Sequence, residues 1–100
     1  MKSTIKSANG TSFHDTTFRA SVAAVRQILG QPQCEQNDGR DKVNFDWKME
    51  TDDGTIFTVY DWKEYRALQE GEIIEWHVGG KSRTDTEKAL TEIIEALNLL

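Results

Sequence analysis

Alternating apolar and polar residues between Val43 and Met49 constrain the fold of this chain more than any other feature. Val43, Phe45, Trp47 and Met49 occupy every second position, and the residues between them are Asn, Asp and Lys. Successive side chains of a strand point to opposite faces, so the pattern predicts a strand with one buried and one solvated face. The Asp-Asp-Gly sequence at 52–54 is typical of a hairpin turn, because glycine readily adopts a positive φ.

Two more strands are predicted after this turn, and another is predicted near the N-terminus. The segment Thr55–Trp62 carries apolar or aromatic residues on both faces, which favours a position in the middle of a sheet. Alternating Ile74, Trp76 and Val78 predict the next strand, ended by the glycine pair at 79–80. A short strand is also predicted near the N-terminus, over Lys2–Ser7.

Apolar residues at helical spacing predict a first helix, and they are Phe18, Val22, Val25, Ile28 and Leu29. The polar segment Thr11–Thr17 is predicted to form the turn before it, with Thr17 or Ser21 as the N-cap. Gly30 suits the left-handed residue after a helix, and Pro32 prevents continuation.

A second helix is predicted from Thr84 to Leu100. Thr84 and Glu87 have the spacing of a capping box, and an apolar stripe follows at Leu90, Ile93, Ile94, Leu97 and Leu100. Between the elements, Cys34–Lys42 is predicted to be a polar loop, and Glu64–Glu72 a polar connection with a helical turn.

These elements predict one α+β domain over residues 1–100, in the order β-α-β-β-β-α. Two helices would pack on one face of a small antiparallel sheet of three to four strands, burying their stripes against Phe45, Trp47 and Ile56 or their neighbours. The helix end Leu29-Gly30-Gln31-Pro32 resembles the LG-x-P step of beta-lactamase-inhibitor-like domains, which share a helix followed by a meander sheet.

Composition narrows the classes of function. No apolar run approaches the roughly 20 residues of a membrane span, and the polar N-terminus has no apolar core of a secretory signal, so we expect a cytoplasmic protein. A net charge of −5 argues against general nucleic-acid binding, which rewards dense Lys and Arg. The single Cys34 excludes an intrachain disulfide and is interpreted as a spectator thiol.

A candidate anion site follows the last predicted strand. Its ingredients are backbone N–H groups of a glycine turn, a helix start, two cations and a hydroxyl, supplied by Gly79, Gly80, Lys81, Ser82 and Arg83. Position 75 is Glu where a Walker A loop needs glycine, so the segment does not indicate nucleotide hydrolysis. The alternative is an ordinary strand-to-helix turn.

A second candidate combines aromatic and cationic residues, which can stack on a base and hold its phosphate, or anchor a protein partner. Its members are Tyr60, Trp62 and Tyr65, with Lys63 and Arg66 at the rim, and His77 of the next predicted strand is a further candidate. The alternative places the aromatic side chains in the core, and this is the favoured interpretation for Trp47 and Trp76 but not for Trp62. His14 with Asp15, and His77 with Asp61, lack a nucleophile and a paired ligand motif, so we expect no enzymatic activity, no metal and no cofactor.

The segments Phe57–Tyr65 and Trp76–Gly80 resemble small phage-encoded accessory and counter-defence proteins. The resemblance implies a protein that sequesters a nucleotide immune signal, or one that occludes a host protein. We therefore expect capture of a small phosphorylated ligand, such as a cyclic nucleotide. Tyr60, Trp62 and Tyr65 would stack on the base, and Gly79–Arg83 would bind phosphate.

The alternative is an inhibitor whose acidic surface meets a basic host protein. Its charges would come from the loop residues Asp38, Asp41, Asp52 and Asp53. Either protein is expected to form a homo-oligomer, because a small sheet has edges that a second copy would cover.

Overall fold

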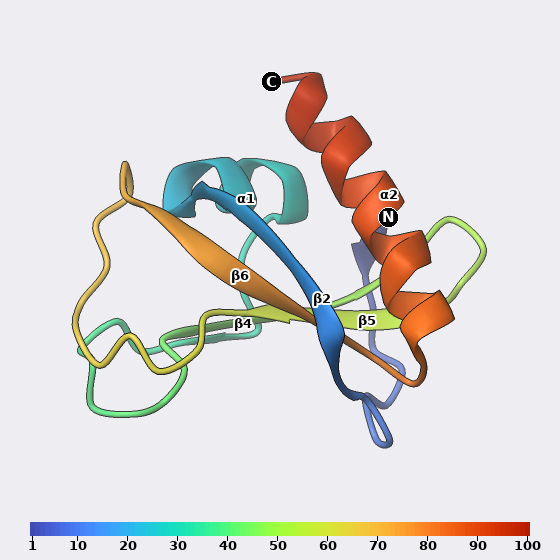
Figure 1. Ribbon diagram of the computed structural model, residues 1–100, viewed down its shortest axis with the longest axis horizontal. Helices are drawn as coiled ribbons and strands as arrows, with labels where there is room; N and C mark the ends of the chain where they lie inside the picture. The colour runs from blue at the N-terminus through green and yellow to red at the C-terminus, as the bar shows by residue number, and fades with distance from the viewer.

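Six strands form one open antiparallel sheet, and two helices lie against one of its faces (Figure 1); the computed structural model describes all 100 residues. The elements in chain order are β1 (Lys2–Ser3), β2 (Ser12–Ser21), α1 (Val22–Leu29), β3 (Cys34–Glu35), β4 (Phe45–Glu50), β5 (Ile56–Tyr60), β6 (Ile73–Gly80) and α2 (Arg83–Asn98). The sheet order is β1-β4-β5-β6-β2, and β3 also pairs with β4. The predicted α+β class is confirmed, whereas the expected three to four strands were too few.

The meander of β4, β5 and β6 is the part of the fold that the sequence indicated best. β5 lies between β4 and β6, which confirms its predicted central place. The turn before it is also confirmed: Gly54 has a φ of 85°, and its N–H donates to the carbonyl of Thr51 at 2.9 Å. β5 ends at Tyr60 rather than Trp62, because backbone N–H groups next to β4 bind the side chain of Asp61.

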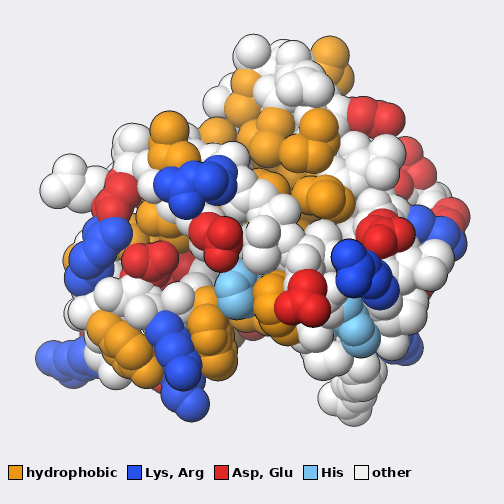
Figure 2. All heavy atoms as spheres, in the orientation of Figure 1, with side chains coloured by type: hydrophobic (Ala, Val, Ile, Leu, Met, Phe, Trp, Pro, Cys, Tyr) orange, Lys and Arg blue, Asp and Glu red, His pale blue; other side chains and the backbone are white.

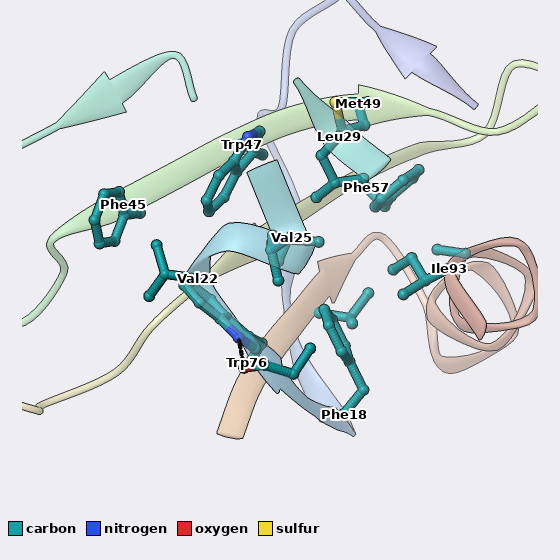
Figure 3. Packing of buried hydrophobic residues seen from close by; sticks show 14 of the residues in the cluster. Phe18, Val22, Val25, Leu29, Phe45, Trp47, Met49, Phe57, Trp76 and Ile93 are labelled. Carbon is teal, nitrogen blue, oxygen red and sulfur yellow. Dashed lines mark hydrogen bonds between the residues drawn. The ribbon is translucent and has the colours of Figure 1, made fainter. Parts of the chain in front are cut away.

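The core fills the space between the sheet and the helices (Figure 3). Trp47 and Trp76 meet there edge to face, with ring centroids 5.6 Å apart. The sheet also contributes Phe45, Met49, Phe57, Val59 and Val78, and the helices contribute Val22, Val25, Leu29, Ala89 and Ile93. Ile56 was expected on this face, but the alternation of β5 buries Phe57 and Val59 and leaves Ile56 with Thr58 and Tyr60 on the other face.

The turn predicted over residues 11–17 was wrong, and so was the placement of Phe18 in the first helix. Most of the expected turn and Phe18 belong to β2, where Thr16, Phe18 and Ala20 alternate inward and the strand pairs with β6. Pairing along the whole length of β6 outweighs the local preference of Ser and Thr for turns. The helix begins at Val22, with Ser21 as N-cap, which was one of the two candidates.

Three smaller predictions also need correction. β1 ends at Ser3 instead of Ser7, because the Thr4 hydroxyl binds Glu50 and the Lys6 N–H, which turns the chain away. Residues 64–72 form no helical turn, and positive φ angles at 63 and 65 are incompatible with one. The loop at 34–42 contains the two-residue strand β3.

The capping box predicted at Thr84 is absent. The N-cap of α2 is Ser82, whose hydroxyl accepts the N–H of Asp85 at 3.1 Å. Glu87 instead forms an ion pair with Arg83 at 3.2 Å. Ser82 retains the extended backbone in which the chain leaves β6, so the N-cap lies two residues before the expected Thr84 and the helix begins at Arg83.

Candidate functional site

The face of the sheet opposite the helices carries two adjacent rows of side chains. The strand register aligns Asp46, Tyr60, His77 and Thr17 in the first row. It aligns Lys48, Thr58, Gly79 and Phe13 in the second. All of these except glycine are partly exposed, and no helix covers them. We call this surface the open face.

Four rings form a cluster on the open face, which we call the aromatic cluster: Phe13, Tyr60, Trp62 and His77. His77 lies at its centre, stacked on Phe13 with centroids 4.2 Å apart and on Trp62 at 6.2 Å. Tyr60 meets both His77 and Trp62 edge to face, at 5.5 and 6.2 Å. Figure 2 shows both histidines on one side of the molecule, one of them flanked by hydrophobic side chains.

The tryptophans divide sharply between core and surface. Trp47 and Trp76 are fully buried, as the sequence interpretation favoured, whereas Trp62 is 40% exposed. Phe13 is 39% exposed. Single exposed apolar side chains are ordinary, whereas rings gathered into one contiguous surface often mark a binding site.

Two lysines accompany Trp62. The Nζ atoms of Lys42 and Lys63 lie 5.9 and 5.6 Å from the centre of its ring, within the range of a cation–π interaction. The backbone joins them as well, since the Lys63 N–H donates to the Lys42 carbonyl at 2.7 Å. Lys63 has a φ of 56°, a conformation that non-glycine residues adopt rarely and that is most common at functional sites.

A buried polar network holds these loops in place. Asp61, with 0% of its surface exposed, accepts the N–H groups of Asn44 and Phe45, both at 2.9 Å, and the Asn44 side-chain amide at 3.1 Å. Asn44 in turn donates to the Arg66 carbonyl at 2.9 Å. The network therefore ties the start of β4 to the loop that carries Trp62 and Lys63. Asp61 was considered for acid–base chemistry, but its position is structural.

A hollow of about 360 Å³ lies beside the cluster. Gly79 forms part of its floor: a β-carbon there would clash with Thr58 Oγ1 and lie 3.5 Å from Tyr60 Cε1. The other lining residues are Ala8, Thr11, Ser12, Val43, Asp46, Thr58 and Tyr60. The volume falls at the lower end of the range for small-molecule sites.

Burial shifts the pKa values of three titratable groups on the open face. Burial, and then the nearby charge of Asp61, raise the pKa of Asp46 above its usual range. Burial lowers the pKa of His77, against a smaller opposite effect of Glu75, so its ring is neutral at pH 7. Burial, with the charge of Asp46, also raises the pKa of Tyr60.

The predicted glycine turn does not form. Gly79 and Gly80 are buried inside β6, paired with β2 on one side and β5 on the other, so their backbone groups face neighbouring strands. Neither needs a positive φ, and Gly79 serves instead to leave room. Ser82 caps α2 and Arg83 pairs with Glu87, while Lys81, which precedes both, is exposed.

The structure thus brings part of the predicted site together and separates the rest. Tyr60, Trp62 and His77 are in contact, and Gly79 adjoins Tyr60. Gly80 pairs with Phe57 near the other end of β5, so Lys81–Arg83 lie away from the cluster. Tyr65 is exposed on the loop that follows β5, and Arg66 forms an ion pair with Glu72.

The four aspartates of the alternative hypothesis do not form one surface. Asp38 and Asp41 precede β4 and Asp52 and Asp53 follow it, and six strand residues span roughly 20 Å at about 3.3 Å each. Asp52 pairs with the N-terminal ammonium at 2.7 Å, and Asp53 with Lys88 at 3.3 Å. Their charges are therefore partly neutralised within the chain.

The sequence interpretation did not assign three residues of this region to the candidate site. Phe13 was assigned to a turn because of the polar residues around it, and in the structure it belongs to β2, on the far side of a bulge around Asp15. Lys42 was placed in a featureless loop, 20 residues from Trp62 in sequence. Asp46 was correctly placed on the solvated face of its strand, but its position opposite Tyr60 depends on the register.

Neither helix is long and apolar enough to cross a membrane. No three His, Cys, Asp or Glu side chains are grouped so that they could hold a metal ion. Searches against protein-family models, curated proteins and solved structures give no match to this chain.

Proposed function

We propose that this chain is a non-enzymatic binding protein that captures a nucleotide on the open face of its sheet. The observation that carries the proposal is the aromatic cluster, in which exposed rings lie next to two lysines. Aromatic side chains stack on nucleobases, at about 1–3 kcal/mol per base, and ammonium groups neutralise phosphate. An α+β sheet with rings on its uncovered face is a rigid platform for that purpose.

The arrangement assigns separate roles to its members. The indole of Trp62, exposed and without a hydrogen-bond partner in the chain, is the main stacking surface, supported from beneath by His77 and Tyr60. Because burial keeps His77 neutral, its ring supports the stack without adding charge. Lys42 and Lys63 take the phosphate, in place of the Lys81 and Arg83 that the sequence suggested.

The resemblance to phage counter-defence proteins gives this binding a biological role. A protein without catalytic groups acts on a signal by mass action, so we propose that it sequesters a nucleotide immune signal. Sequestration requires affinity and abundance rather than turnover, which fits a small domain with a stiff binding surface. Self-association through the outer edge of β2 would present two such faces.

Isothermal titration with nucleoside monophosphates and cyclic nucleotides tests the proposal. Trp62→Ala should weaken binding roughly 5- to 150-fold, the equivalent of about 1–3 kcal/mol of lost stacking. Ile73→Ala is the matched control, since it removes an exposed apolar side chain of β6 outside the cluster. Equal affinity of the wild type and Trp62→Ala would contradict the proposal.

The cations can be assigned in the same titration. We expect Lys42→Ala combined with Lys63→Ala to weaken binding and to reduce its dependence on salt. The pair Lys81→Ala and Arg83→Ala removes the same charge at the start of α2. If only this second pair weakened binding, phosphate would lie at the helix start instead of beside Trp62.

A further inference from the structure

The hollow next to the aromatic cluster contains polar groups that the chain itself leaves unused. Asp46 projects from β4 directly opposite Tyr60, and its carboxylate makes no hydrogen bond or ion pair within the chain. Its surroundings are half-buried, as the raised pKa of the group reflects. The hydroxyls of Tyr60 and Thr58, which line the same hollow, also have no partner in the chain. Three unpaired polar groups thus converge on one space.

The Asp46 carboxylate is partly desolvated without a protein partner, which raises the free energy of its ionised form, and its oxygen atoms remain open to the hollow. Elsewhere this chain pairs its buried polar groups completely, and no fully buried side-chain nitrogen or oxygen lacks a partner. Asp61, which lies nearby, shows how this fold satisfies a structural carboxylate, with three N–H groups around it. Asp46 has no such set, so its acceptor atoms remain available to a ligand.

The chemistry of a carboxylate restricts what it recognises on a nucleobase. Ionised oxygen atoms only accept hydrogen bonds, so the matching edge must present adjacent N–H donors. Guanine presents two, at N1 and at the 2-amino group. Adenine and cytosine place a ring-nitrogen acceptor beside their amino group, and uracil flanks its single N–H with carbonyls. Each of these would direct lone pairs at the carboxylate.

We propose that the hollow is a subsite for the edge of a guanine base, with the Asp46 carboxylate accepting the N1–H and 2-amino hydrogens. Tyr60 belongs to both the hollow and the aromatic cluster and so joins this edge subsite to the stacking surface of Trp62, whose ring centroid lies 6.2 Å from that of Tyr60. Gly79 leaves the floor open, because any side chain there would meet Thr58 and Tyr60. The inference rests on the proposed nucleotide capture and specifies which nucleotide is captured.

The test is isothermal titration of the full chain with guanosine and adenosine monophosphates. The wild type should bind the guanine nucleotide at least tenfold more tightly, since a site built to pair with N–H donors discriminates strongly against their absence. Asp46→Asn should lose tenfold or more in affinity for the guanine nucleotide and little for the adenine nucleotide. Glu75→Gln, which removes an acidic charge from the same face outside the hollow, should behave as the wild type.

The Asp46→Asn variant should fold normally. Burial raises the pKa of Asp46, so its ionised form costs stability above that pKa, and a neutral amide of the same shape removes this cost at pH 7. Circular dichroism checks this. Inosine monophosphate, which lacks the 2-amino group, provides a comparison that needs no variant, and the wild type should bind it more weakly than guanosine monophosphate.

The outcomes separate the two proposals. Equal affinity for guanine, adenine and inosine nucleotides, or an Asp46→Asn variant that loses affinity for all of them alike, overturns the guanine subsite and leaves nucleotide capture intact. Failure of every nucleotide to bind the wild type at millimolar concentration overturns both.

Discussion

An Asp61→Ala variant should be less stable than the wild type by about 3–5 kcal/mol, among the largest effects of any single substitution in this chain. The substitution leaves the N–H groups of Asn44 and Phe45 and the Asn44 side-chain amide without their acceptor, in a region closed to water. An unsatisfied buried donor costs about 1–3 kcal/mol. Guanidinium chloride unfolding, followed by tryptophan fluorescence, measures the difference.

Asp61→Asn is the matched control for this prediction. Both backbone N–H groups bind the same carboxylate oxygen, Oδ1, which an asparagine retains, and only the contact from Asn44 Nδ2 to Oδ2 is lost. We therefore expect a loss of about 1–2 kcal/mol. If Asp61→Ala cost less than Asp61→Asn, the network would not be what orders the loop that carries Trp62.

The second large effect is expected for Trp76→Ala, at about 3–5 kcal/mol. Trp76 is fully buried at the centre of the core, meets Trp47 edge to face at 5.6 Å, and donates its indole N–H to the Ala20 carbonyl at 3.0 Å. The substitution leaves a large cavity and removes the indole hydrogen bond. A domain of this size is stable by only about 5–15 kcal/mol, so thermal unfolding should move to much lower temperature.

Trp62→Ala serves as the comparison, and we expect it to lower the stability only slightly. Trp62 is 40% exposed, and its indole makes no hydrogen bond within the chain, so its removal should cost less than about 1 kcal/mol. The two substitutions remove the same atoms from opposite faces of one sheet. Equal destabilisation would contradict the division of the tryptophans into core and surface.

Local pattern and tertiary pairing explain which parts of the fold were predictable. The alternation at 43–49 and the glycine at 54 specify β4 and its turn by short-range physics, and both were predicted correctly. β2 was missed because its Ser and Thr residues favour turns locally, while the strand exists through pairing with β6, more than 50 residues away in sequence.

The candidate site was predictable only in part for the same reason. Alternation placed Tyr60 and Trp62 on one face, and in the structure the third predicted member, His77, contacts both of them. Phe13, Lys42 and Asp46 join the site through strand register and loop packing, which no local pattern encodes. The glycine pair was misinterpreted because glycine permits a tight turn and a close approach of two segments equally well. In this fold the missing side chain of Gly79 leaves room for Thr58 and Tyr60 of β5.

The central claim, that the open face binds a nucleotide through Trp62, is tested most directly by the three indole N–H signals in a ¹H–¹⁵N NMR titration with guanosine monophosphate. The indoles of Trp47 and Trp76 are buried and bound to the carbonyls of Gly30 and Ala20, whereas that of Trp62 is free. The account predicts that the Trp62 signal shifts progressively to saturation while the other two stay in place. A titration in which the Trp62 signal does not move would contradict it.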